Sequence, residues 1–147
     1  MTLVGLETDD IAALAGLSGL TNLEMTDAGS VADITPIGRL LGLQTINLSR
    51  CPKVENLSPL SSLTSLTDLN LSDCKSVENI TPLEKLARKL TNLNLVGTRV
   101  NYVMPLSKLS NLKTLDLQRC EKLTAGDVEW LTKRLSECKI LADDPAK

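Results

Sequence analysis

The stretch "LTDLNLSDC" alternates apolar and polar positions. Leu69 and Leu71 are apolar, whereas Asp68 and Asn70 beside them are polar. A period of two is typical of a short strand that buries one of its faces. We therefore expect a strand here, with its polar side chains exposed.

A short helix is expected after each such strand. Thr81 precedes Pro82, and proline at a first helical position gives up no donor that the helix needs. The Thr81 hydroxyl can cap free backbone amides, and Glu84 would complete a capping box. Thr35-Pro36 and Ser58-Pro59 repeat the arrangement. Each unit is thus expected to be a strand, a turn and a short helix or 3₁₀ turn.

The whole unit recurs every 23 residues. This spacing relates four prolines and five leucines: Pro36, Pro59, Pro82 and Pro105; Leu17, Leu40, Leu63, Leu86 and Leu109. Rows of the form L-x-x-L-x-L-x-x-C, or close to it, begin at Leu43, Leu66, Leu90 and Leu112, with a weaker row at Leu20. A fixed period of this length indicates a solenoid, in which each unit stacks on its neighbours.

These rows resemble the leucine-rich repeat family over nearly the whole chain. The "ITPL" and "LSPL" segments are similar to the internalin-like bacterial type, and the 23-residue period with cysteine is similar to repeats of some protozoan proteins. The resemblance implies an α/β solenoid with a concave parallel sheet and convex short α or 3₁₀ helices. We expect one domain, 1–147, with a partial repeat over 1–19, five repeats over 20–123 and a C-terminal cap over 124–147.

One repeat departs from the period and then returns to it. The segment 86–90 has one residue more than its equivalent 63–66, and 98–100 has one fewer than 74–77. Within "PLEKLARKL" the leucines fall at i, i+3 and i+7, which predicts a true α-helix in this repeat.

The C-terminal cap is expected to contain a helix over 127–136. Val128, Leu131 and Leu135 share one face of it, and Trp130 lies toward the other side. Trp130 either covers the edge of the last repeat or is offered to a partner. With Tyr102, Arg99 and Met104 it could form a second binding surface on the C-terminal flank.

Composition and charge narrow the classes of function. The net charge is −2 and Lys and Arg form no long run, so we expect no nucleic-acid partner. No apolar run approaches the ~20 residues of a membrane span, so no membrane insertion is expected. The first residues are acidic, unlike a signal peptide, which favours a cytoplasmic protein.

The chain offers little chemistry for catalysis. It has no His, no Cys-x-x-Cys and no glycine-rich phosphate loop, so we expect no metal, no cofactor and no enzyme activity. Cys51, Cys74 and Cys120 share one repeat position, which Thr98 fills in another repeat. We interpret them as buried structural thiols, and Cys138, outside the repeat, as the most exposed one.

Polar columns on the concave sheet are the expected binding surface. One column is expected to run from Glu24 to Asp116, and the others lie beside it, one of them from Thr26 to Gln118. The Asn side chains could instead ladder with one another. No aromatic residue lies on this face, so arginines are its strongest anchors. The candidate concave residues are Asn47, Asp68, Asn70, Asn94, Asp116, Arg50, Asp73 and Arg119; those of the flank are Tyr102 and Trp130.

These observations favour a monomeric, non-catalytic module or scaffold that binds another protein. This rests on analogy with the fold and on the absence of catalytic chemistry. A surface or secreted adhesion protein and a structural spacer within a larger protein stay open as alternatives.

Overall fold

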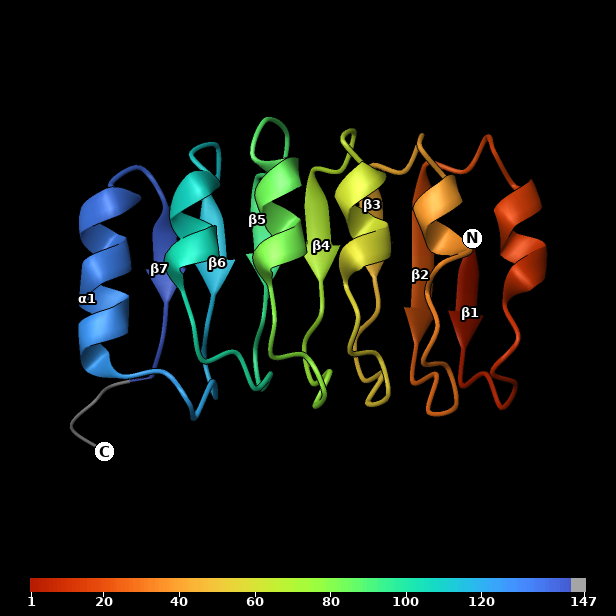
Figure 1. Cartoon of the computed structure of the whole chain (residues 1–147), viewed down its shortest axis with the longest axis horizontal. Helices are drawn as coiled ribbons and strands as arrows, with labels where there is room; N and C mark the ends of the chain where they lie inside the picture. The colour runs from red at the N-terminus through yellow and green to blue at the C-terminus, as the bar shows by residue number, and fades with distance from the viewer. Residues whose placement is uncertain (144–147) are drawn as a thin grey trace.

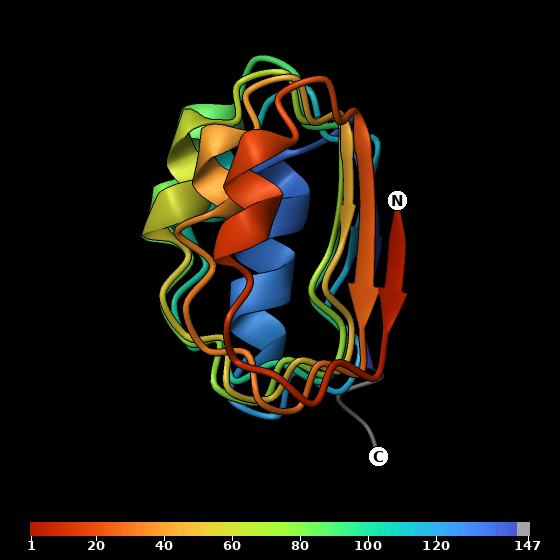
Figure 2. The ribbon, with the colours of Figure 1, turned by 90° about the vertical axis from the view of Figure 1, so that its right-hand side faces the viewer.

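The computed structural model describes residues 1–143, which form two layers, a sheet and a row of helices (Figures 1 and 2). All seven strands of the sheet in this range are parallel and follow one another in chain order. They are β1 (Thr2–Val4), β2 (Asn22–Thr26), β3 (Thr45–Asn47), β4 (Asp68–Asn70), β5 (Asn92–Asn94), β6 (Thr114–Asp116) and β7 (Lys139–Leu141). The predicted repeat solenoid is confirmed.

The second layer covers one face of the sheet and leaves the other open, as the end-on view of Figure 2 shows. It contains five 3₁₀ helices and, at the C-terminal end, one α-helix within the described range. They are η1 (Ala12–Gly16), η2 (Ile37–Arg39), η3 (Ser58–Ser62), η4 (Thr81–Leu86), η5 (Met104–Lys108) and α1 (Ala125–Arg134).

Leucines of successive repeats stack into a continuous core between the two layers. Leu69 in β4 and Leu71 just after it reach the core from the sheet side, and Leu60 and Leu63 from the helix side, all at most 2% exposed. Fully burying one such side chain stabilises the fold by about 1.5–3 kcal/mol. At the N-terminal end this stacking is incomplete, since Leu17, equivalent to Leu63, is 41% exposed.

The α-helix expected within "PLEKLARKL" is not formed, and that prediction was wrong. Residues Thr81–Leu86 form a 3₁₀ helix, and one i+4 bond, from Leu90 N–H to the Leu86 carbonyl (3.0 Å), accommodates the extra residue. Ile80, Leu83 and Leu86 are buried at intervals of three. A 3₁₀ helix has three residues per turn, so it keeps all three side chains on the core side.

The helix starts are also stabilised differently from the prediction. Thr81 and Glu84 do not form a capping box, and neither the Thr81 nor the Ser58 hydroxyl caps its helix. Instead, Asn79 Oδ1 accepts the Thr81 N–H and Asn56 Oδ1 accepts the Ser58 N–H, each at 3.0 Å. The residue two places before the helix therefore holds its first turn.

The C-terminal cap contains more than the predicted helix. Helix α1 begins two residues earlier than expected, at a capping box between Thr124 and Asp127. Leu131 and Leu135 are buried, as predicted. The chain then returns as β7, a strand that was not expected, which pairs in parallel with β6.

The cysteines of the repeat are free, buried thiols, as expected. Cys74 Sγ donates to the Leu48 carbonyl at 3.1 Å, and Cys51 and Cys120 make equivalent bonds to the preceding repeat. Burial raises the pKa of Cys74 to about 12. The thiols therefore serve as hydrogen-bond donors between repeats.

Candidate functional site

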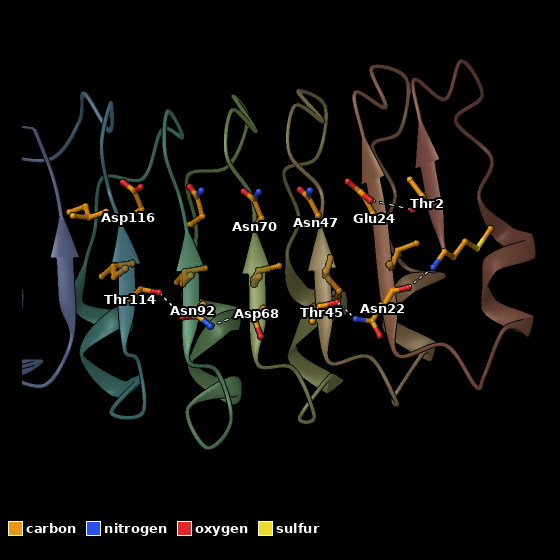
Figure 3. Close-up of a pocket in the computed structure, with 18 residues that line it drawn as sticks. Thr2, Asn22, Glu24, Thr45, Asn47, Asp68, Asn70, Asn92, Thr114 and Asp116 are labelled. Atoms are coloured by element: carbon orange, nitrogen blue, oxygen red, sulfur yellow. Dashed lines mark hydrogen bonds between the residues drawn. The ribbon is translucent and has the colours of Figure 1, made fainter.

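An open groove with a volume of about 590 Å³ runs along the uncovered face of the sheet (Figure 3). Two columns of polar side chains, here called the sheet face, line it. The strand register aligns the first column as Asn22, Thr45, Asp68, Asn92 and Thr114, and the second as Thr2, Glu24, Asn47, Asn70, Asn94 and Asp116.

Side-chain bonds in the first column join β2 to β3, β4 to β5 and β5 to β6 (Figure 3). Asn22 Nδ2 donates to Thr45 Oγ1 at 2.7 Å. Asn92 Nδ2 donates to Asp68 Oδ1 at 2.5 Å, and Thr114 Oγ1 donates to Asn92 Oδ1 at 2.6 Å. These bonds join neighbouring strands and fix the side chains in place. Cross-strand laddering occurs in this column.

The second column is bonded mainly within each strand. Asn47, Asn70 and Asn94 each accept, through Oδ1, the backbone N–H two residues on, at 2.9–3.0 Å. Asp116 does the same for Gln118. An asparagine held by Oδ1 keeps both N–H groups of Nδ2 available as donors. The sheet face thus presents a row of oriented amides beside a row of interlinked side chains.

The charge of the sheet face is negative. Glu24, Asp68 and Asp116 contribute carboxylates, and the side chains that line the groove include no Lys or Arg. Asp68 and Asp116 are half-buried. The groove therefore suits partners that offer hydrogen-bond donors or positive charge.

Three predicted anchors, Arg50, Asp73 and Arg119, lie outside the groove. They belong to a row at the carboxyl ends of the strands, here called the turn row: Asp27, Arg50, Asp73, Gly97 and Arg119, all with φ between 56° and 66°. Left-handed backbone is uncommon for arginine. Each arginine is held there by an aspartate of the same row.

Ion pairs occupy the turn row. Arg50 binds Asp27 through two bonds, of 2.5 and 2.6 Å, and Arg119 Nη2 donates to Asp73 Oδ2 at 3.0 Å. The hydrogen bond from Arg50 lowers the pKa of Asp27, and those from Lys75 and Arg119 lower that of Asp73. The arginines are therefore already partnered within the chain.

The expectation that the column from Thr26 to Gln118 faces outward is wrong at its beginning. Thr26 and Ser49 are buried, each 6% exposed. Strand β3 ends at Asn47, whose side chain bonds the Ser49 N–H, so the chain turns at Ser49 instead of continuing as strand.

Tyr102 and Trp130, the candidate binding residues of the C-terminal flank, lie on a loop and on helix α1. Tyr102, on the loop before η5, is 54% exposed, and its hydroxyl donates to Met104 Sδ at 3.1 Å. Trp130, on α1, is partly buried against the core, and the guanidinium of Arg134 lies 4.0 Å from its ring centre. Trp130 therefore covers the edge of the core while one face of its ring holds Arg134.

Both ends of the groove were missed by the sequence analysis. Thr2 on β1 contributes a hydroxyl that donates to Glu24 Oε2 at 3.2 Å, and Leu141 on β7 contributes an apolar side chain. Neither "TLV" nor "KIL" alternates polar and apolar residues, and neither segment lies in a complete repeat, so the period-two pattern offered no signal there.

Within residues 1–143 the structure shows neither a metal-binding cluster nor a membrane-spanning helix. No group of three or more His, Cys, Asp or Glu side chains within 1–143 is placed to hold a metal ion. No helix in this range is long and apolar enough to span a membrane.

Comparison with known proteins gives matches in structure only. No family model and no curated protein sequence matches the chain. Among solved structures, an internalin of Listeria monocytogenes has 25% sequence identity and a TM-score of 0.80, covering 90% of this chain and 37% of that one. Internalin C2 of the same organism has 27% identity and a TM-score of 0.81, covering 97% and 60%.

A third similar structure is a complex of TLR13 with a single-stranded RNA. Its identity is 26% and its TM-score 0.62, over 74% of this chain and 17% of that one. The chain thus spans less than two thirds of each of these three proteins.

Proposed function

Since the chain is a leucine-rich repeat solenoid, we propose that it acts as a non-catalytic protein-interaction module whose partner binds on the sheet face. The observation that supports this most is the groove across the sheet, because its polar lining comes from six strands, β1 to β6. A partner laid across it would contact several repeats at once.

The chemistry of the groove favours a polar protein segment. The second column offers amide donors at regular intervals, and Asp68 and Asp116 offer acceptors. Pre-ordered side chains lose little conformational freedom on binding, which favours affinity. The groove lining has no Trp, Tyr or Phe, the bulky anchors that dominate many interfaces. We therefore expect moderate affinity.

The comparisons support a binding role in general terms. One neighbour was solved in complex with RNA, but the carboxylates of this groove would repel a phosphate backbone. A protein partner is the better fit. The proposal includes a cytoplasmic location, a monomeric state and no cofactor.

A pull-down from the native cell lysate tests the binding face. The test variant carries Asn70→Arg and Asn94→Arg, which fill the middle of the groove. The matched control carries Thr64→Arg and Ser110→Arg, both at exposed positions on the helix side. Circular dichroism checks that each variant is folded.

The expected result is a partner that the wild type and the control retain and the sheet-face variant loses. Equal retention by all three proteins would contradict binding on the sheet face. In that case Tyr102→Ala and Trp130→Ala test the C-terminal flank.

A further inference from the structure

Two departures from the repeat coincide at the carboxyl end of β5. Gly97 occupies the turn row, where the neighbouring repeats carry Asp or Arg. The turn that follows it, 98–100, is one residue shorter than its equivalents. A regular repeat needs neither change, and places where a sequence departs from its own rule are often functional.

A small pocket of about 260 Å³ lies at this place, on the edge toward which the strands point in Figure 1. Four cationic side chains from three successive repeats line it. The lining residues are Lys75, Gly97, Thr98, Arg99, Arg119, Glu121 and Lys122. None of them lines the sheet-face groove.

The missing side chain of Gly97 makes this arrangement possible. A Cβ atom there would lie 2.6 Å from Asp73 Oδ1 and 3.2 Å from Lys75 Nζ. The Asp73 carboxylate fills that space and binds Lys75 Nζ and Arg119 Nη2, each at 3.0 Å. Lys75 also donates to the Gly97 carbonyl at 3.1 Å. Asp73 thus holds two cations on either side of Gly97.

The cations keep unused capacity for an anion. A guanidinium has five N–H donors, and Arg119 uses one of them on Asp73. Arg99 Nε lies 3.3 Å from Glu78 Oε1. Lys75 and the two arginines are each more than half exposed. A ligand can therefore reach them.

The charge balance indicates the kind of anion. Among the side chains that line the pocket or form ion pairs with its lining, the four cations face three carboxylates, those of Asp73, Glu78 and Glu121. This leaves an excess of one positive charge, in a chain whose net charge is −2. One carboxylate would neutralise it, whereas a phosphate group carries about −1.5 to −2.

Asp143 does not line this pocket, but lines the neighbouring one beside α1 and contacts the backbone of one residue of the cationic pocket. Asp143 Oδ2 accepts the backbone N–H of Arg119 at 2.6 Å. We propose that this cationic pocket around Gly97 docks an Asp or Glu side chain of a protein partner. The site is separate from the sheet face, so either one can fail its test without the other.

Titration with a blocked oligoglutamate peptide, followed by amide NMR shifts, tests the pocket. The shifts are expected at Lys75, Gly97, Arg99 and Lys122. Lys122→Glu should weaken binding roughly five- to tenfold, since it replaces an exposed cation with a repelling charge. Lys108→Glu, the same charge change on exposed η5, is the control and should leave the affinity unchanged.

Gly97→Ala is the second variant, and thermal melting shows whether it remains folded. Its Cβ would displace Asp73, so it should weaken peptide binding without changing the net charge. Equal weakening by Lys108→Glu, or shifts on the sheet face instead of the pocket, would overturn the proposal. Inorganic phosphate serves as the competitor, and tighter binding of phosphate than of the peptide would overturn the carboxylate assignment.

Discussion

The repeats that contain β4 and β5 differ in length but contribute equivalent leucines to the core. Strands begin at Asp68, Asn92 and Thr114, so these repeats are 24 and 22 residues long. The first gains its residue after the helix, and the second loses one in its turn. Their core leucines are nevertheless equally buried. The stacked positions therefore set the spacing, and the loops absorb differences in length.

The turns of the two repeats differ in chemistry as well as length. Asp73 and Cys74 in the first correspond to Gly97 and Thr98 in the second. Cys74 Sγ bonds the preceding repeat, whereas Thr98 Oγ1 donates to Leu95 in its own repeat at 2.7 Å. The β5 repeat thus lacks the bond to the preceding repeat, although Thr98 Oγ1 lies 3.6 Å from Cys120 Sγ of the next one, and it leaves room at Gly97 for the Asp73 carboxylate. A shared core can carry two kinds of turn.

The largest expected effect is the loss of stability when a core leucine is removed, and it tests whether the β4 and β5 repeats are packed equally well. Leu71→Ala and Leu95→Ala each remove a fully buried side chain. Both should lower the free energy of unfolding by about 2–5 kcal/mol, through lost burial and a residual cavity. Urea denaturation measures this. Leu17→Ala, at a partly exposed end position, should cost clearly less. A much smaller loss for Leu95→Ala would show that the shorter repeat is packed less tightly.

A smaller effect is expected from the cysteine position. Cys74→Ala should destabilise by about 1–2 kcal/mol, because it removes a fully buried thiol and a hydrogen bond between repeats. Thr98→Ala should cost about 1 kcal/mol or less, since the Leu95 carbonyl still accepts from Cys120 Sγ at 3.1 Å. Thermal unfolding of both variants measures the difference. The reverse order would mean that the thiol bond contributes little to stacking.

The sequence predicted the features that follow from periodicity. The repeated rows, which begin 22 to 24 residues apart, placed the leucines of each strand and the register of β2 to β6, because stacking requires equivalent residues to lie side by side. It also placed Asn47, Asn70 and Asn94 along the groove. Periodicity carries information about every repeat at once, which is why these predictions held.

Features decided by single residues were predicted less well. The sequence alone did not show that Asn79 would hold the helix start in place of Thr81, because Asn and Thr side chains can both accept backbone N–H groups near the start of a helix. Strand β7 was missed, since it follows α1 and lies outside the repeat pattern. The pairing of Arg119 with Asp73, two strands away, depends on the gap at Gly97. Such choices depend on side-chain geometry in three dimensions.

The smallest expected effect concerns the Asp73 carboxylate, in the turn after β4, and its contribution to stability as the pH falls. Hydrogen bonds from Lys75 and Arg119 lower the pKa of Asp73 in the folded chain. A lowered folded pKa stabilises the fold above the unfolded value of about 3.9, and this contribution is lost as pH falls through the folded pKa. Asp73→Asn should therefore lose less stability than the wild type between about pH 6 and pH 3.

Urea denaturation at both pH values measures this difference, and Asp27→Asn provides a comparison in a regular repeat. Asp27 has a lowered pKa through Arg50 alone among the cations, whereas Asp73 has two cationic partners across the gap at Gly97. Both aspartates are partly exposed to solvent, so each effect should be small and should shrink in high salt. An acid response of Asp73→Asn identical to that of the wild type would mean that Asp73 does not hold Lys75 and Arg119 in solution. The open turn of the β5 repeat would then lack the ordered cations that distinguish it from its neighbour.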